Sequence, residues 1–169
     1  VRMEVRQADG DGVSNVTLRD LIRTSLRMRP DRIIVGEVRG EEALDMIQSM
    51  NTGHDGSLST GHANSPQDML SRLETMALFA SDIPIQAIRK QIASSIDIIV
   101  QLERLRDRSR RVTAIAEVLD CTEDAYILNP IFEFHEQDNL VMESSSYGDI
   151  PERVVGQLER TGYHLMHRR

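Results

Sequence analysis

The chain is poor in cysteine and lysine and has no long apolar run. Its single cysteine, Cys121, excludes an internal disulfide and fits a reducing compartment. No apolar run approaches the roughly 18 residues that a membrane span requires. The only lysine is Lys90, and the pattern G-x-x-x-x-G-K-[ST] does not occur. A phosphate-gripping loop of that type needs glycines for close backbone approach and a lysine for its charge, so this chain carries none.

The balance of charge and hydrophobicity is that of a globular domain. Hydrophobic residues make up 40% and charged residues 28% of 169 residues, which permits one domain with a substantial core. The formal net charge of -7 argues against nucleic acid as the main partner, because non-specific binding depends on basic charge. Five arginines between residues 104 and 111 are a local exception. They predict a solvated hairpin turn, with contact to a membrane surface or an acidic loop as alternatives.

Residues 26–40, LRMRPDRIIVGEVRG, are the most informative segment of the chain. The β-branched run Ile33-Ile34-Val35 has the length and composition of a buried parallel strand. The run ends in Gly36-Glu37, which places a carboxylate at the carboxyl end of the strand, where open α/β sheets bind ligands. Enzymes that hydrolyse nucleotides use a residue in such a place to orient the attacking water.

This segment resembles the Walker B signature of the type II/IV secretion ATPases, the hexameric motors of secretion and pilus systems. The matching positions are Leu26, Arg27, Pro30, Asp31, Ile33, Ile34, Val35, Gly36, Glu37, Val38 and Arg39. Gly40 stands where the family pattern has Asp. Residues 52–64, TGHDGSLSTGHAN, resemble the histidine box of the same family. The sequence GHDGSLSTGHANSP (residues 53–66) and the later LSRLETM are similar to the tight-adherence (Flp) pilus branch. The resemblance to the family covers about residues 1–135.

The resemblance implies an α/β fold: a partial RecA-like P-loop NTPase core, with a parallel sheet flanked by helices and an antiparallel hairpin at its edge. We expect residues 1–135 to be the C-terminal part of the ATPase domain and residues 136–169 to be a polar loop and short tail. The chain is then a C-terminal piece of a longer motor, or alternatively a natural piece that is catalytically inactive. Residues 1–7 and 56–61 are expected as strands, the latter central, although its local propensity favours a loop.

Local patterns predict the remaining elements. The capping-box spacing of Thr17 and Asp20 begins a helix that Pro30 closes. Further helices are predicted from Glu41 to Gly53, from Ser65-Pro66, and near Pro84. Strands are predicted over residues 98–102, 112–119 and 126–134, the first two as a hairpin. Residues 144–149 are predicted as a loop, residues 151–160 as a short helix, and residues 9–12 as a turn.

Glu37 is the main candidate for catalysis. The resemblance implies that it polarises water at the γ-phosphate of ATP; a helix-capping or ion-paired glutamate is the alternative. Gly36 replaces the Asp of most such strands, which implies that Mg²⁺ is held largely by phosphate-loop groups outside this chain and by water. His62 resembles the second histidine of the box, with a role in sensing the γ-phosphate or relaying its state through Glu37 to a subunit interface.

Two other residues have more open roles. His54 resembles the first histidine of the box, and a catalytic role and a structural role at a turn are both open. Arg39 is predicted to pair with Glu41 or Glu42, or to face the nucleotide. A metal site at His54, Asp55 and His62 matches no zinc-ligand spacing, so no metal ligand is expected within this chain.

The resemblance therefore implies an ATP- and Mg²⁺-dependent motor subunit that powers pilus assembly or protein secretion across the inner membrane. It is expected in the cytoplasm as a homohexamer on inner-membrane platform proteins, with membrane association through these partners and no nucleic acid. Without a phosphate-binding loop, the isolated chain is expected to be inactive. A non-hydrolytic RecA-like scaffold is the alternative, and a nucleic-acid-driven motor is disfavoured by the acidic balance.

Overall fold

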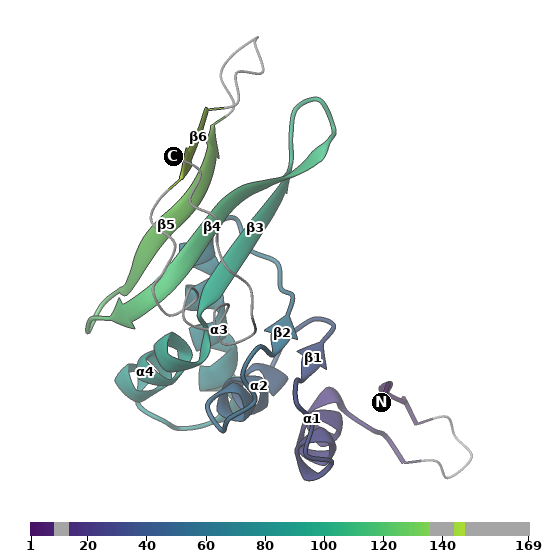
Figure 1. Cartoon of the computed structure of the whole chain (residues 1–169). Helices are drawn as coiled ribbons and strands as arrows, with labels where there is room; N and C mark the ends of the chain where they lie inside the picture. The colour runs from purple at the N-terminus through teal and green to yellow at the C-terminus, as the bar shows by residue number, and fades with distance from the viewer. Residues whose placement is uncertain (9–13, 136–143, 148–169) are drawn as a thin grey trace. The chain divides into compact units, whose positions relative to one another are not determined.

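The computed structural model describes residues 1–8, 14–135 and 144–147, which form two compact units (Figure 1). The first unit comprises residues 1–97 and 119–127, and the second comprises the described residues of 98–118 and 128–169. The helices and short strands of the first unit are α1 (Leu18–Arg27), β1 (Ile34–Val35), α2 (Glu42–Met50), β2 (Leu58–Ser59), α3 (Pro66–Ala80) and α4 (Ile85–Ser95). No helix in the described part of the chain is both long and apolar enough to cross a membrane.

Helix α1 begins at the predicted capping box. The Thr17 hydroxyl accepts a hydrogen bond from the Asp20 backbone N–H at 3.2 Å, and the Asp20 carboxylate accepts from the Thr17 backbone N–H at 2.9 Å. Two backbone donors that the first turn leaves unsatisfied are thus paired. Helix α1 buries Ile22 and Ser25 and packs against α2.

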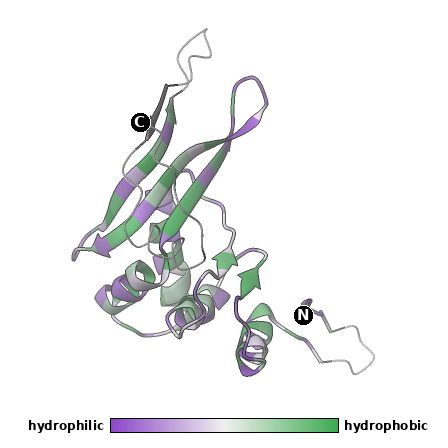
Figure 2. Ribbon diagram, in the orientation of Figure 1, coloured by the Kyte–Doolittle hydropathy of each residue, from purple (hydrophilic) through white to green (hydrophobic). Residues whose placement is uncertain are grey.

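Strands β1 and β2 form a parallel pair. Ile34 lies opposite Leu58, and Val35 lies opposite Ser59. Figure 2 colours β1 green, as its apolar composition requires. Successive strand side chains point to opposite faces, so Val35 is buried while Ile34 is 73% exposed. The prediction of a buried strand is therefore correct for one face only.

The strand predicted from the histidine-box resemblance is confirmed as β2, although it is short. Its pairing continues past the strand, because the Val38 backbone N–H donates to the Thr60 carbonyl at 3.0 Å. Among the described residues β1 is the one strand that pairs with β2, so the expected central position is not observed there. Leu58 is 58% exposed beside Ile34, which leaves one face of this pair open.

Helices α2, α3 and α4 contact one another and form the core of the first unit. Ser65 caps α3 by accepting from the Asp68 backbone N–H at 3.0 Å, and Pro66 takes the first helical position, as predicted. Gly53 lies just beyond α2 with φ of +89°, a left-handed backbone conformation that glycine adopts readily. The largest fully buried aliphatic side chains of this core are Ile47, Leu70, Leu73, Ile88 and Ile92.

Two predictions about strands are wrong. Residues 1–7 do not form a strand; among the described residues only Arg6 forms a bridge, with Val16. A strand persists only where a neighbour supplies hydrogen bonds, and one bridge does not suffice. Residues Ser144–Tyr147, predicted within a loop, form strand β6 because they pair with β5. The predicted turn at 9–12 and helix at 151–160 lie outside the described residues.

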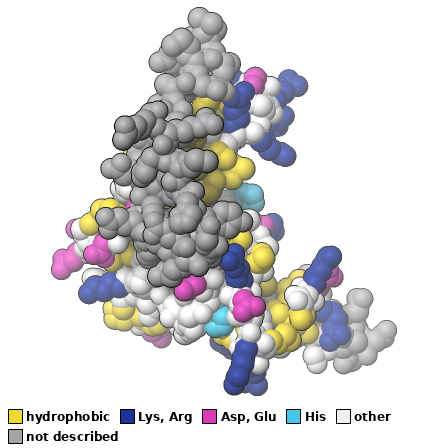
Figure 3. Space-filling view, in the orientation of Figure 1, with side chains coloured by type: hydrophobic (Ala, Val, Ile, Leu, Met, Phe, Trp, Pro, Cys, Tyr) yellow, Lys and Arg dark blue, Asp and Glu magenta, His cyan; other side chains and the backbone are white. Residues whose placement is uncertain are grey.

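The second unit is an antiparallel sheet. Strands β3 (Ile98–Arg104), β4 (Arg110–Cys121), β5 (Tyr126–His135) and β6 (Ser144–Tyr147) lie in sequence order, and the ends of β4 and β5 belong to the first unit. The predicted β3–β4 hairpin is confirmed. In Figure 3, dark blue side chains gather around the turn of this hairpin, which agrees with the predicted solvated basic turn.

Candidate functional site

Glu37 lies at the carboxyl end of β1, and His62 follows the carboxyl end of β2. Because the two strands are parallel, their ends meet at the same edge. His62 Nε2 lies 3.0 Å from Glu37 Oε1. The structure therefore brings together the two residues that were predicted from separate motifs.

The carboxylate of Glu37 is held by two side chains. Arg39 donates a hydrogen bond to its second oxygen, Oε2, and His62 lies against the first. The Glu37 side chain is 22% exposed, whereas those of Arg39 and His62 are 74% and 80% exposed. One half-buried carboxylate is thus flanked by two groups that remain open to solvent.

The positive surroundings of Glu37 affect its ionisation. The hydrogen bond from Arg39 lowers the pKa of Glu37, and the charges of Arg39, His62 and Arg72 act in the same direction. These effects outweigh partial burial, which acts to raise the pKa. The carboxylate is accordingly ionised at neutral pH, so both of its oxygens are available to accept a hydrogen bond or a proton.

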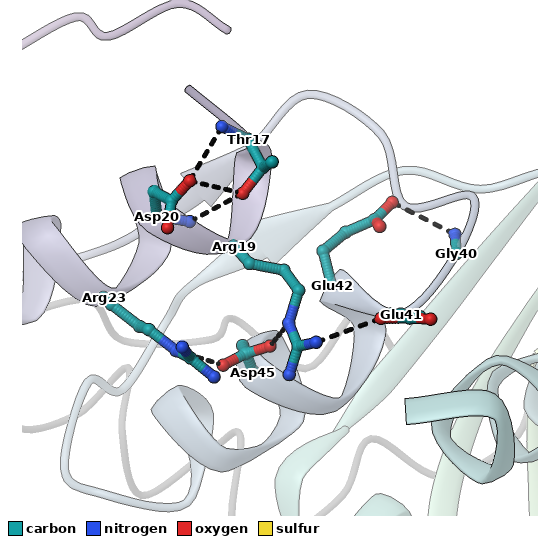
Figure 4. Close-up of polar contacts among 8 residues, drawn as sticks. All are labelled: Thr17, Arg19, Asp20, Arg23, Gly40, Glu41, Glu42 and Asp45. Atoms are coloured by element: carbon teal, nitrogen blue, oxygen red, sulfur yellow. Dashed lines mark hydrogen bonds and ion pairs between the residues drawn. The ribbon is translucent and has the colours of Figure 1, made fainter. Parts of the chain in front are cut away.

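The backbone around Glu37 is fixed from two sides. The Thr60 hydroxyl donates to the Gly36 carbonyl, and the Thr60 carbonyl accepts from the Val38 N–H. On the other side, one oxygen of Glu42 accepts from the backbone N–H groups of Arg39 at 2.7 Å and Gly40 at 3.1 Å. The Glu42 contact to Gly40 is visible in Figure 4.

Arg72 on α3 is a further member of the site. Its guanidinium donates to the His62 backbone carbonyl at 2.8 Å, and its charge contributes to the lowered pKa of Glu37. Sequence reasoning missed Arg72, Thr60 and the contact of the Glu42 carboxylate with the loop N–H groups. A position on a helix surface carries no local signal for contact with a loop ten residues away, so only the fold identifies Arg72.

His54 is not brought to Glu37. It precedes β2, whereas His62 follows it, and its Nδ1 lies 3.1 Å from the Ser49 carbonyl. The His54 carbonyl accepts from the Ser57 hydroxyl at 2.7 Å, and that hydroxyl accepts from the Ile33 N–H at 3.0 Å. These contacts join the α2–β2 turn to the start of β1, which agrees with the structural alternative for His54.

The predicted partner of Arg39 is wrong. Its guanidinium pairs with Glu37, not with Glu41 or Glu42. Glu42 is occupied by backbone N–H groups, and Glu41 lies 3.0 Å from an amino group of Arg19 on α1.

A cluster of charged side chains joins α1 to α2. Asp45, whose side chain is 8% exposed, accepts from Arg19 Nε at 2.5 Å and from Arg23 Nε at 2.9 Å (Figure 4). Both helices present their charges four residues apart, which matches one helical turn. The start of α2, and with it the loop that follows β1, is therefore tied to α1.

The site does not form a metal cage by itself. In the part of the chain that the structure describes, no three His, Cys, Asp or Glu side chains gather as a metal-ligand set. Both oxygens of Glu37 already have side-chain partners, Arg39 at Oε2 and His62 at Oε1. Mg²⁺ in nucleotide sites is bound mainly by phosphates and water with one or two protein ligands, so this donor set does not fit a resident ion.

Comparisons with known proteins place the chain in a family of secretion and conjugation proteins. The family model described as "Type II/IV secretion system protein" matches residues 2–144. A Mycobacterium tuberculosis protein named for conjugal transfer is 40% identical over 116 residues, which cover 69% of this chain and 33% of that protein. The type IV secretion system protein PtlH of Bordetella pertussis is 38% identical over 99 residues, covering 57% of this chain and 29% of that protein.

A solved structure supports the same grouping. The crystal structure of the VirB11 ATPase from the Brucella suis type IV secretion system, in complex with sulphate, matches with a TM-score of 0.58 and 33% sequence identity. The match covers 60% of this chain and 32% of that chain. This similarity confirms the predicted RecA-like α/β fold. The chain spans about one third of the length of these relatives.

Proposed function

Because the chain belongs to the type II/IV secretion system protein family, we propose that it forms part of an ATP-hydrolysing motor and carries the residue that activates water. The observation that supports this role is the Glu37 carboxylate at the carboxyl end of β1, ionised and held between Arg39 and His62. Phosphoryl transfer depends on positioning and electrostatics, which such an arrangement provides.

In this proposal Glu37 accepts a hydrogen bond from the attacking water and orients it toward the γ-phosphate of ATP. His62 is the second functional group: its ring contacts Glu37 and is 80% exposed, so it can reach a phosphate or a neighbouring subunit. An imidazole can donate to phosphate or to carboxylate, which suits a residue that relays the state of the nucleotide to Glu37. Mg²⁺, when bound with ATP, would neutralise phosphate charge, and its ligands would come mainly from outside this chain.

Arg39 has a supporting place in the same proposal. It holds one oxygen of Glu37 and is 74% exposed, so its charge lies near any anion that approaches the carboxylate. His54 is the weaker candidate for catalysis, because it precedes β2 and its ring contacts the Ser49 carbonyl on α2.

The test is steady-state ATP hydrolysis by the natural full-length protein that contains this chain. Glu37→Gln keeps the shape of the side chain but removes its charge, and we expect hydrolysis to fall about 100-fold or more while nucleotide binding persists. Glu41→Gln is the matched control, because Glu41 contacts Arg19 on the surface and does not touch Glu37. Wild-type activity in Glu37→Gln would refute the assignment of Glu37.

We further propose that the complete protein works as a cytoplasmic homohexamer on inner-membrane platform proteins of a pilus or secretion system, in the tight-adherence branch. The sequence of residues 53–66, which resembles that of the tight-adherence branch, supports this assignment. Co-purification of the full-length protein with a membrane platform protein, and its mass in solution, test this assembly. A folded hexamer that binds nucleotide without hydrolysing it would instead favour a scaffold.

A further inference from the structure

The loop that carries Glu37 ends at a carboxylate that neither the motif nor the comparisons assign. This carboxylate belongs to Glu42, the first residue of α2. One of its oxygens accepts from two successive backbone N–H groups, those of Arg39 and Gly40, at 2.7 and 3.1 Å. The residue that precedes α2, Glu41, makes no side-chain cap, so Glu42 supplies the hydrogen bonds at this end of the loop.

We propose that Glu42 is a positioning residue for the proposed hydrolytic site, acting through Arg39 on Glu37. The step from Glu42 to Arg39 is direct, because the bonded N–H belongs to Arg39 itself. The step from Arg39 to Glu37 is the guanidinium–carboxylate hydrogen bond. Fixing the Arg39 backbone reduces the conformations in which its long, solvent-exposed side chain would leave Glu37.

Gly40 contributes to the same contact between Glu42 and the loop. A Cβ added at Gly40 would lie 3.3 Å from the second oxygen of Glu42, closer than nearly all such contacts. Glycine therefore leaves room for the Glu42 carboxylate to pass across the loop and reach both N–H groups. At the position where the family signature has Asp, this chain has glycine, whose missing Cβ leaves this space to the Glu42 carboxylate.

The helix that carries Glu42 is itself held in place. Helix α2, which begins with Glu42, is tied to α1 through Asp45 and its two arginine partners (Figure 4). A hydrogen-bonding carboxylate at the first turn is further favoured by the helix dipole. Glu42 can thus transmit the position of a packed helix to the loop that holds the catalytic candidate.

The proposal rests on the proposed function, and the experiment separates the two. ATP hydrolysis by the full-length protein is measured across pH for wild type, Glu37→Gln, Glu42→Ala, Glu42→Gln and the control Glu41→Ala. If Glu37→Gln is as active as wild type, the proposed function fails. If Glu37→Gln is inactive but Glu42→Ala behaves as wild type, only the positioning role fails.

We expect Glu42→Ala to lower kcat about ten- to a hundred-fold with little change in KM, because misplacement of a reacting group costs rate more than binding. The acid limb of kcat/KM should also move to higher pH, because Arg39 would no longer hold down the pKa of Glu37. A purely structural loss of folded enzyme would scale the whole profile without moving this limb.

Two further variants keep the result interpretable. Glu42→Gln retains an oxygen that can accept from both N–H groups and should restore most of kcat. Gly40→Ala should shift the same limb in the same direction, and combining it with Glu42→Ala should add little, since both act on one contact. Loss of activity in Glu42→Ala with an unmoved limb, or failure of Glu42→Gln to rescue, would overturn the proposal.

Discussion

The buried ion pair between Glu74 on α3 and Arg89 on α4 gives a prediction with a calculable size. Arg89 donates from Nε to Glu74 Oε1 at 2.6 Å and from a terminal amino group to Oε2 at 3.1 Å. Both side chains are only 10% exposed. The second amino group donates to the Glu123 carbonyl, and the guanidinium lies 5.9 Å from the ring centroid of Tyr126.

Removing one partner leaves the other without compensation. Arg89→Leu would leave the Glu74 carboxylate buried and unpaired, and we expect it to lower the free energy of unfolding by about 3–5 kcal/mol at pH 7. Removing both charges with Glu74→Leu and Arg89→Leu together should cost far less, because a buried ion pair replaced by apolar side chains is often close to neutral. The comparison of single and double variants isolates the coupling.

The pH dependence follows from the pKa of Glu74. Burial acts to raise this pKa, but the hydrogen bonds and the charge of Arg89, with a contribution from the nearby Tyr126 hydroxyl, outweigh burial and leave the pKa below its ordinary value. A carboxyl group whose pKa is lower in the folded state stabilises the fold. This contribution is complete above the unfolded pKa, about 4.3, and is lost as the pH falls through the folded pKa. In Arg89→Leu, burial remains as the main influence on the pKa of Glu74, so this pKa should rise. The loss of unfolding free energy caused by the substitution should therefore be smallest at acidic pH.

Urea unfolding followed by circular dichroism at pH 7 and pH 4 measures both effects. The difference between wild type and Arg89→Leu should shrink at pH 4, because Glu74 is then protonated in the variant. A destabilisation below about 1 kcal/mol at pH 7 would refute the claim that the pair is buried and coupled. A difference that is the same at both pH values would refute the electrostatic explanation.

Two more substitutions test how the site is supported. Asp45→Asn should lower the free energy of unfolding by about 1.5–3 kcal/mol, because it weakens hydrogen bonds to two charged arginines. Urea unfolding that matches wild type would contradict the inference that these hydrogen bonds hold α1 against α2. Gly61→Ala places a Cβ 2.4 Å from Met69 Cε, the end of a flexible and partly exposed side chain that can move aside, so we expect thermal unfolding to change by less than about 1 kcal/mol. A larger loss of stability would contradict this expectation, because it would mean that Met69 cannot move away from residue 61.

Signals local in the sequence predicted most helices and the hairpin. Thr17 with Asp20 and Ser65 with Pro66 marked helix starts because caps satisfy backbone donors within one turn, where only neighbours matter. Strand β2 was different: the local propensity of its segment favoured a loop, and only the family resemblance predicted a strand there. The strand expected over residues 1–7 failed for the reverse reason, since strand formation depends on a partner that may lie anywhere in the chain.

The sequence by itself determined that a carboxylate at Glu37 ends an aliphatic strand and that His62 belongs to a second motif nearby. The first of these rests on composition and order along the chain, and the second rests on the resemblance to the family's histidine box. Only the tertiary structure decided that the two side chains meet, that Arg39 turns back to Glu37, and that Glu42 and Arg72 hold the surrounding backbone. Parallel pairing of β1 with β2 brings distant residues to one edge, and hydrogen bonds between such residues depend on distances in space that no local pattern encodes.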